Sequence, residues 1–159
     1  MTITEYNNLV ELYADRVYRF VLKCIRSEEL AKDIVQESFA RMWKNRPEID
    51  GNKGKSYLFT TAHHMVIDTV RKEQRQTVVE QVPERGHESN YSDLREILDE
   101  ALEKLPSMQK SVIVLRDYEG YSYKEIASIC DISEAQVKIN IYRGRVALKK
   151  YIGSMETVI

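Results

Sequence analysis

Two helix starts lie eleven residues apart near the C-terminus, and this spacing constrains the fold more than any other feature. Ser122 is followed three residues later by Glu125, and Ser133 by Gln136. Each pair fits a capping box, in which a Ser hydroxyl and a Glu or Gln side chain satisfy the free N–H groups at a helix start. Only Asp131 and Ile132 separate the predicted helix over 123–130 from Ser133, the cap of the next helix. So short a connection is typical of a helix-turn-helix.

The rest of the sequence also favours helices, since only three Pro and six Gly occur in 159 residues while strong helix formers recur throughout. Apolar residues repeat every three or four positions in three N-terminal segments, about 6–24, 28–43 and 56–70, which predicts amphipathic helices. Ser27 and Ser56 are the expected N-caps of the second and third helices. Between them, residues 47–55 read as a loop that starts at Pro47. We predict an all-α fold that begins with a three-helix bundle.

Apolar periodicity is lost from 77 to 91, which predicts a flexible linker. A helix over 94–105 then ends at Pro106, and a short helix from Ser107 reaches a stop at Gly120. We therefore expect two small helical domains, residues 1–76 and 92–159, joined by the linker.

Several functional classes are disfavoured by the sequence. Cys24 and Cys130 lie in apolar helical patterns with no His or Cys at metal-ligand spacing, so we expect reduced core residues and no metal site. There is neither a signal peptide pattern nor an apolar run of membrane length, which predicts a cytoplasmic protein without direct membrane insertion. Residues 51–56 (GNKGKS) lack the first glycine of a phosphate-binding loop, because that position is Ile49. We expect no enzyme activity, no catalytic residue, no cofactor and no small-molecule substrate.

The helix after Ser133 is a candidate nucleic-acid contact. The net charge of the chain is −1, so any such contact must come from a local patch. Residues 133–151 hold five cations against one carboxylate, Glu134, whereas residues 80–104 hold eight carboxylates against three cations and should avoid DNA. A helix-turn-helix places its second helix in the major groove. The alternative is a solvated helix face. The cations are Lys138, Arg143, Arg145, Lys149 and Lys150.

A second candidate patch covers the third helix and the loop before it, where cations alternate with aromatic rings. Single-stranded nucleic acid needs both, because unstacked bases stack on rings and phosphates bind cations. The alternative is that Phe59 is ordinary core and the His residues ordinary surface. The patch contains Lys53, Lys55, Tyr57, Phe59, His63, His64, Arg71, Lys72 and Arg75.

Three motifs resemble bacterial RNA polymerase sigma factors of the extracytoplasmic-function (ECF) group, in the sigma-70 family. Residues 33–43 (DIVQESFARMW) resemble the polymerase-binding helix of that group, and residues 57–72 (YLFTTAHHMVIDTVRK) its minus-ten helix. Residues 105–127 (LPSMQKSVIVLRDYEGYSYKEIA), with Val137-Lys138 and Arg143-Gly-Arg145, resemble its minus-thirty-five domain. The motifs follow the order of the family over nearly the whole chain. Departures are Tyr57 for Trp, His64 for Asn, Asp131 for Gly and Gln136 for Thr, and they bear on promoter preference rather than on the class of protein.

The resemblance implies three sets of binding residues. Contacts to the minus-thirty-five duplex would come from Ser133, Glu134, Gln136, Lys138, Asn140, Arg143 and Arg145. Contacts to the minus-ten element would come from Asn52, Lys53, Lys55, Tyr57, His63, His64, Arg71, Lys72 and Arg75. Contacts to core RNA polymerase would come from Asp33, Gln36, Glu37, Phe39, Trp43 and Lys44.

The expected function is therefore a sigma factor that binds core RNA polymerase, reads minus-thirty-five duplex DNA and melts the minus-ten element. Residues 1–76 would correspond to sigma region 2 and residues 92–159 to region 4. The resemblance also implies an anti-sigma factor as a partner. The alternative is a stand-alone helix-turn-helix repressor or activator, which would have no need for the motif at 33–43.

Overall fold

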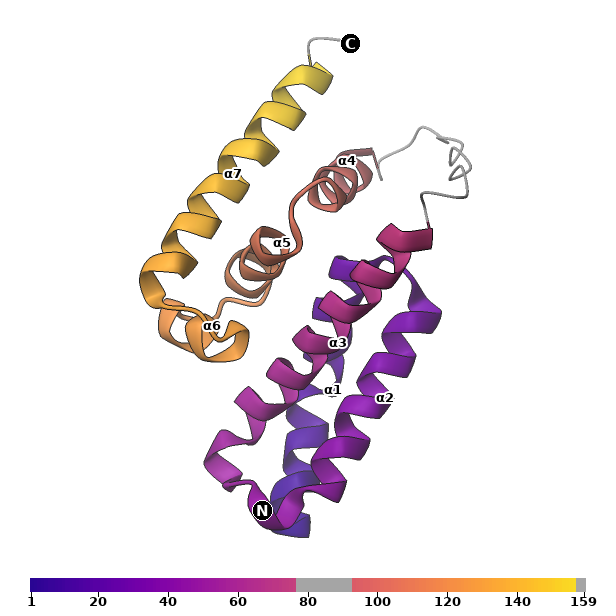
Figure 1. Ribbon diagram of the computed structural model, residues 1–159, viewed down its shortest axis with the longest axis vertical. Helices are drawn as coiled ribbons and strands as arrows, with labels where there is room; N and C mark the ends of the chain where they lie inside the picture. The colour runs from indigo at the N-terminus through magenta and orange to yellow at the C-terminus, as the bar shows by residue number, and fades with distance from the viewer. Residues whose placement is uncertain (77–92, 157–159) are drawn as a thin grey trace.

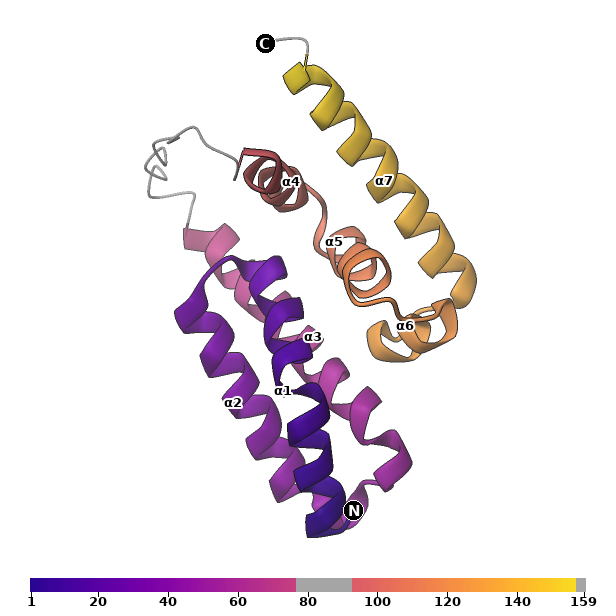
Figure 2. The same ribbon diagram turned by 180° about the vertical axis from the view of Figure 1, so that it is seen from behind.

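The computed structural model describes residues 1–76 and 93–156, and in these two ranges every regular element is helical (Figures 1 and 2). The all-α prediction is confirmed. The principal helices are α1 (Ile3–Ile25), α2 (Glu28–Lys44), α3 (Gly54–Gln76), α4 (Asp93–Glu103), α5 (Ser107–Ile113), α6 (Tyr123–Cys130) and α7 (Glu134–Glu156). The predicted linker 77–91 lies outside the described residues.

The first two helices begin and end as local chemistry requires. Thr2 and Glu5 form a capping box at the start of α1, which the sequence reading did not identify. Arg26, with φ of 58°, ends α1 in the left-handed region, and the hydroxyl of Ser27 accepts from the Leu30 N–H to cap α2, as predicted.

The expected loop at 47–55 is more ordered than predicted. It contains two 3₁₀ turns, η1 (Arg46–Glu48) and η2 (Gly51–Lys53), and α3 begins at Gly54. The prediction that Ser56 caps α3 is therefore wrong. The α-amino group of Met1 donates to the carbonyls of Arg46 and Ile49 at 3.0 and 2.8 Å, so a residue more than forty positions away in the sequence shapes this turn.

Gly54 makes a close approach that only glycine allows. A Cβ at this position would lie 2.3 Å from Cδ1 of Leu9 on α1. The missing side chain lets the start of α3 pack directly against α1.

The helix that follows Pro106 changes form partway along. α5 continues into a π-helical turn, η3 (Val114–Tyr118), which was not predicted. The predicted stop at Gly120 is confirmed, since this residue has a φ of +74°.

The helix-turn-helix is confirmed in its details. The hydroxyls of Ser122 and Ser133 accept from the N–H groups of Glu125 and Gln136, and each partner side chain accepts in return. Asp131 adopts φ of 55°, which allows the short turn of three residues, 131–133, between α6 and α7. Val137 and Ile141 of α7 are buried in the same apolar cluster as Ile126 of α6.

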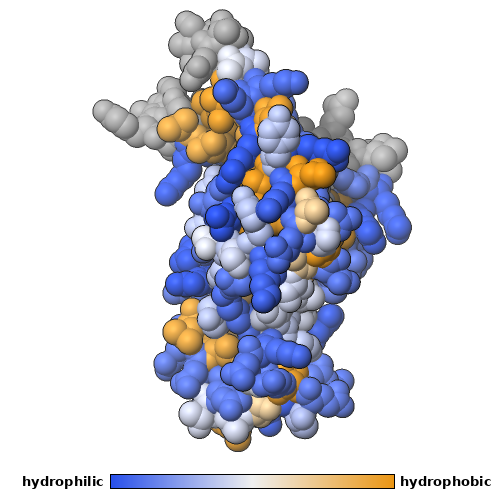
Figure 3. All heavy atoms as spheres, turned by 90° about the vertical axis from the view of Figure 1, so that its left-hand side faces the viewer, coloured by the Kyte–Doolittle hydropathy of each residue, from blue (hydrophilic) through white to orange (hydrophobic). Residues whose placement is uncertain are grey.

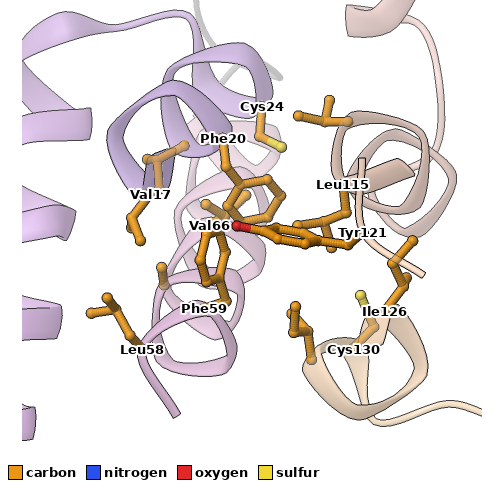
Figure 4. Packing of buried hydrophobic residues seen from close by; sticks show 14 of the residues in the cluster. Val17, Phe20, Cys24, Leu58, Phe59, Val66, Leu115, Tyr121, Ile126 and Cys130 are labelled. Atoms are coloured by element: carbon orange, nitrogen blue, oxygen red, sulfur yellow. The ribbon is translucent and has the colours of Figure 1, made fainter. Parts of the chain in front are cut away.

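The two halves of the chain pack against each other through one shared core. α4 and α5 lie between the α1–α3 bundle and α7, which forms the far edge of the molecule (Figures 1 and 2). Figure 4 shows the Tyr121 ring, from the second half, against Phe59 of α3, with a centroid distance of 5.2 Å. The ammonium of Lys110 is buried and donates to the carbonyl of Cys24 at 3.2 Å. The polar and apolar contacts together join both halves.

Both cysteines lie in this shared core. Cys24 and Cys130 are free and buried, as predicted. Burial raises the pKa of each thiol to about 12, so neither carries thiolate at neutral pH.

Candidate nucleic-acid interface

The outer face of α7 carries the first candidate set. Lys138 and Arg143 are exposed, and the Lys138 ammonium lies 5.7 Å from the centre of the Tyr123 ring. Arg145 is also exposed, but it forms two hydrogen bonds to the carboxylate of Asp117, which raise its pKa. Two of the three predicted cations are thus open to a ligand at the surface.

The polar side chains expected to read bases are engaged within α7 itself. The Gln136 carboxamide accepts from the Ser133 N–H at 2.9 Å, as part of the capping box. Asn140 donates from its side chain to the Gln136 carbonyl at 2.8 Å. Glu134 is exposed at the first position of the helix. Figure 3 views the side of the molecule on which α7 lies and shows apolar groups among hydrophilic ones there.

The second candidate set, on η2 and α3, divides into exposed and covered members. Asn52 and Lys53 are exposed in η2, and the Tyr57 hydroxyl accepts from the Asn45 side chain at 2.9 Å. A cavity of about 340 Å³ opens beside Lys53 and Tyr57, and another of about 560 Å³ lies between Tyr57 and His64. The cations near the end of α3, namely Arg71, Lys72 and Arg75, are all exposed.

His63 and Lys55 lie instead against the helix-turn-helix. His63 is 2% exposed, and burial, with a smaller contribution from His64, lowers its pKa to about 4, so the ring is neutral. Its Nδ1 has no hydrogen-bond partner among the described residues. His63, His64 and Arg71 line a cavity of about 710 Å³ that also borders Asp131 and Ile132 of the helix turn. Among the predicted minus-ten residues, His63 is the most deeply buried.

Lys55 is held by three groups. Its ammonium pairs with the Glu125 carboxylate of α6 and lowers the pKa of that group. The same ammonium lies 4.0 Å from the centre of the Tyr121 ring and 5.7 Å from that of Tyr13. Sequence reasoning treated Glu125 as a helix cap only and did not single out Tyr121. The sequence feature that could have identified Tyr121 is its position, since it is a large aromatic residue directly after the Gly120 stop.

The third candidate set lies on α2, and its polar members are on the exposed side of this helix. Asp33, Gln36 and Lys44 are exposed there, and Glu37 pairs with Arg41 along the same helix at 3.1 Å. Phe39 is 9% exposed and belongs mainly to the core.

Trp43 is the apolar group that this face offers to a partner. It is 44% exposed, and the Arg46 guanidinium stacks 3.3 Å from the centre of its ring. Tyr6 packs edge-on to the same ring at 4.9 Å. These two neighbours hold the indole in one orientation at the surface.

Charge is distributed unequally across the contact between the two halves. Four ion pairs cross it, and each cation belongs to residues 1–76 while each carboxylate belongs to residues 93–156. The pairs are Arg19–Glu119, Lys23–Asp99, Arg26–Glu103 and Lys55–Glu125. Because most of these groups are partly exposed, each pair contributes modestly to stability.

Other kinds of site are not seen in the ranges that the structure covers. No group of three His, Cys, Asp or Glu side chains is placed to hold a metal ion within residues 1–76 and 93–156. None of the helices described above combines the length and apolar character that a membrane span requires.

Comparison with known proteins identifies relatives for both halves of the chain. Residues 9–76 match the family described as Sigma-70 region 2, and residues 95–148 match Sigma-70, region 4. The chain is 30% identical to the ECF RNA polymerase sigma factor SigM of Bacillus subtilis, with 94% of each chain covered. It is 28% identical to the ECF RNA polymerase sigma factor SigW of the same organism, covering 92% of this chain and 88% of that one.

Solved structures show the same fold. The sigma factor RpoE from Bartonella quintana, solved in complex with the anti-sigma factor NepR, matches with a TM-score of 0.77 and 23% identity, over 95% of this chain and 98% of that one. CnrH, solved with the cytosolic domain of CnrY, matches with a TM-score of 0.71 and 20% identity, over 94% and 88% of the two chains.

Proposed function

The chain belongs to the sigma-70 family of RNA polymerase sigma factors, in its ECF group, and from this membership we propose which residues carry each step of promoter recognition. A sigma factor binds core RNA polymerase and directs initiation at promoters. The proposal assigns residues 1–76 to polymerase binding and the minus-ten element, and residues 92–159 to the minus-thirty-five element. It rests on one observation: three exposed surfaces of suitable chemistry lie on α2, on η2 with α3, and on α7.

The exposed face of α2 is the proposed contact with core polymerase. Its oriented Trp43 ring stands among polar and charged groups, and a large aromatic residue ringed by polar groups is typical of an interface hot spot. Gln36, Glu37, Asp33 and Lys44 supply that polar surround. Phe39 acts by packing α2 in place rather than by direct contact.

The loop and helix at 52–75 are the proposed minus-ten contact. Lys53 and Tyr57 line a cavity, and Asn52 is exposed on the same turn as Lys53, which suits capture of an unstacked base next to its phosphate. Arg71, Lys72 and Arg75 would follow the strand backbone along α3, with His64 between these two groups. Lys55 and His63 would join them only after the helix-turn-helix moves away from α3.

The first turns of α7 are the proposed minus-thirty-five contact. Lys138 and Arg143 would bind phosphates on either side of the groove, and Ser133, Glu134, Gln136 and Asn140 would lie near base edges. Arg145 would contact DNA after exchanging Asp117 for a phosphate.

An anti-sigma factor is a proposed partner. Two proteins of the same fold were solved with protein partners, the sigma factor RpoE with the anti-sigma factor NepR and CnrH with the cytosolic domain of CnrY. None of these steps requires a catalytic group from this chain. A stand-alone repressor is not favoured, because residues 9–76 match Sigma-70 region 2, which a repressor has no need for.

Binding to core polymerase tests the assignment of α2. The double variant Gln36→Ala, Glu37→Ala should bind core polymerase about tenfold more weakly or worse, the scale of a hot-spot loss. Lys32→Ala, on an exposed position of the same helix, is the matched control and should bind normally. Unchanged affinity of the double variant would refute this assignment.

Transcription in vitro tests the rest of the proposal. Purified core polymerase and this protein are incubated with a library of genomic fragments, and the transcripts are mapped. Start sites that share two upstream elements support the proposal, whereas transcription that does not depend on the added protein contradicts it.

A further inference from the structure

The centre of the outer face of α7 is apolar. Val137, Ile141 and Gly144 are buried and define the inner face. At 100° per residue, Ala135, Ile139 and Val146 lie on the opposite side. Ile139 is 49% exposed, and so the helix presents a large branched side chain at the middle of the surface expected to meet DNA.

The neighbouring polar groups do not occupy this central line. The Gln136 carboxamide is bound at the helix start, and the Asn140 side chain is bound to the helix backbone. Both therefore lie close to the helix, and around the helix axis Ile139 lies between them and Lys138.

Cations flank the apolar line on both sides. Lys138 precedes Ile139 by 100° around the helix, and Arg143 lies about 40° beyond it on the other side. A helix in the major groove directs its central line at base edges and its flanks at the two phosphate backbones. A helix docked in this way would direct Ile139 at bases rather than at phosphates.

The major groove offers one apolar group to such a side chain, the C5-methyl of thymine. We propose that Ile139 is a specificity residue that reads the methyl group of one thymine in the minus-thirty-five element, with the small Ala135 leaving room for the base pair one turn earlier. This inference rests on the proposed function of α7.

A thymine-to-deoxyuracil scan tests the inference. Holoenzyme binding is measured on a promoter taken from the transcription experiment, with each thymine of the minus-thirty-five element replaced in turn by deoxyuridine, which removes only the methyl group. At one position the wild-type affinity should fall about fourfold, as expected for loss of one buried methyl. Ile139→Ala holoenzyme should bind normal DNA more weakly and show no response at that position.

Two variants separate the possible outcomes. Tyr142→Ala, which removes an exposed ring one turn further along α7, should keep the wild-type response to deoxyuridine. Lys138→Ala should weaken binding to every duplex equally.

If Lys138→Ala weakens binding but no thymine is sensitive, or if Ile139→Ala keeps the wild-type sensitivity, the inference is wrong while the function of α7 stands. If neither Lys138→Ala nor Ile139→Ala affects DNA binding, the assignment of α7 itself is wrong. Loss of core polymerase affinity in Ile139→Ala, with DNA binding intact, would make this apolar line a protein contact and overturn the inference.

Discussion

Lys55 on α3 and Glu125 on α6, seventy residues apart in the chain, form a direct ion pair across the contact between the two halves. Lys55 is a proposed minus-ten contact, and Glu125 belongs to the first helix of the helix-turn-helix. One interaction therefore joins the two DNA-binding regions and occupies a cation that one of them needs. Glu125 is also the third residue of its helix and completes a capping box with Ser122.

Glu125→Gln should weaken the contact between the halves without unfolding α6. Gln serves as well as Glu in a capping box but cannot form the ion pair. A partly exposed pair contributes up to about 1 kcal/mol. The equilibrium between the form in which the two halves are packed together and a form in which they are apart should therefore shift by about fivefold at most. Small-angle scattering should show the radius of gyration of the variant rising at lower salt than that of wild type. Glu37→Gln, which removes a pair within α2, is the matched control, and equal behaviour of the two variants would contradict this role for Glu125.

The two cysteines should report separation of the halves. Both thiols are buried in the shared core, and burial raises the pKa of each to about 12. Alkylation by iodoacetamide at pH 8 should therefore be slow in the native protein and faster in Glu125→Gln. Cys24→Ser and Cys130→Ser variants, followed by mass spectrometry, assign the signal to one thiol. Rapid modification of both thiols in native wild type would be inconsistent with this packing.

His63 should make stability depend on pH. Its pKa falls from 6.5 to about 4 on folding, so between these values the unfolded chain binds a proton that the folded chain does not. The free energy of unfolding should decrease by about 1.4 kcal/mol for each pH unit as the pH falls through this window, and the effect is complete below pH 4. In urea unfolding at pH 7 and pH 5, His63→Leu should lose about 2 kcal/mol less than wild type. Equal losses in the two proteins would rule out this source of acid sensitivity.

Gly144 should be required where α7 crosses α5. A Cβ at this position would lie 2.2 Å from Cδ1 of Ile113, which is 1% exposed and has little room to move. Gly144→Ala should therefore lower the free energy of unfolding by about 1 to 3 kcal/mol, even though Ala favours helix. Ile113→Val removes the clashing methyl, and in that background Gly144→Ala should become neutral or stabilising. Thermal unfolding of the four proteins forms a double-mutant cycle, and additive effects would exclude the clash.

Local features of the fold could be predicted from the sequence because local chemistry determines them. The capping boxes at Ser122 and Ser133, the cap at Ser27 and the stop at Gly120 each depend on residues within one turn. The start of α3 could not be predicted, because the amino group of Met1 and the side chain of Leu9 contact that turn although they are far from it in the sequence.

The candidate site shows the same division. The exposure of Lys138 and Arg143 agrees with the helical pattern of α7. Periodicity could not show that His63 is covered by the helix-turn-helix or that Lys55 pairs with Glu125. These contacts join residues about seventy positions apart, and each half could satisfy its own pattern without them.

The one-sided charge of the contact has a consequence for how the protein competes for nucleic acid. Arg19, Lys23, Arg26 and Lys55 of the first half are already paired with carboxylates of the second half before any DNA is bound. Binding DNA through such a cation exchanges one anion for another. The duplex still releases its counterions, but the freed carboxylate attracts cations, so the net release of ions is smaller. For contacts made by Lys55, promoter affinity should therefore vary less steeply with salt than it does for contacts made by exposed cations such as Arg71.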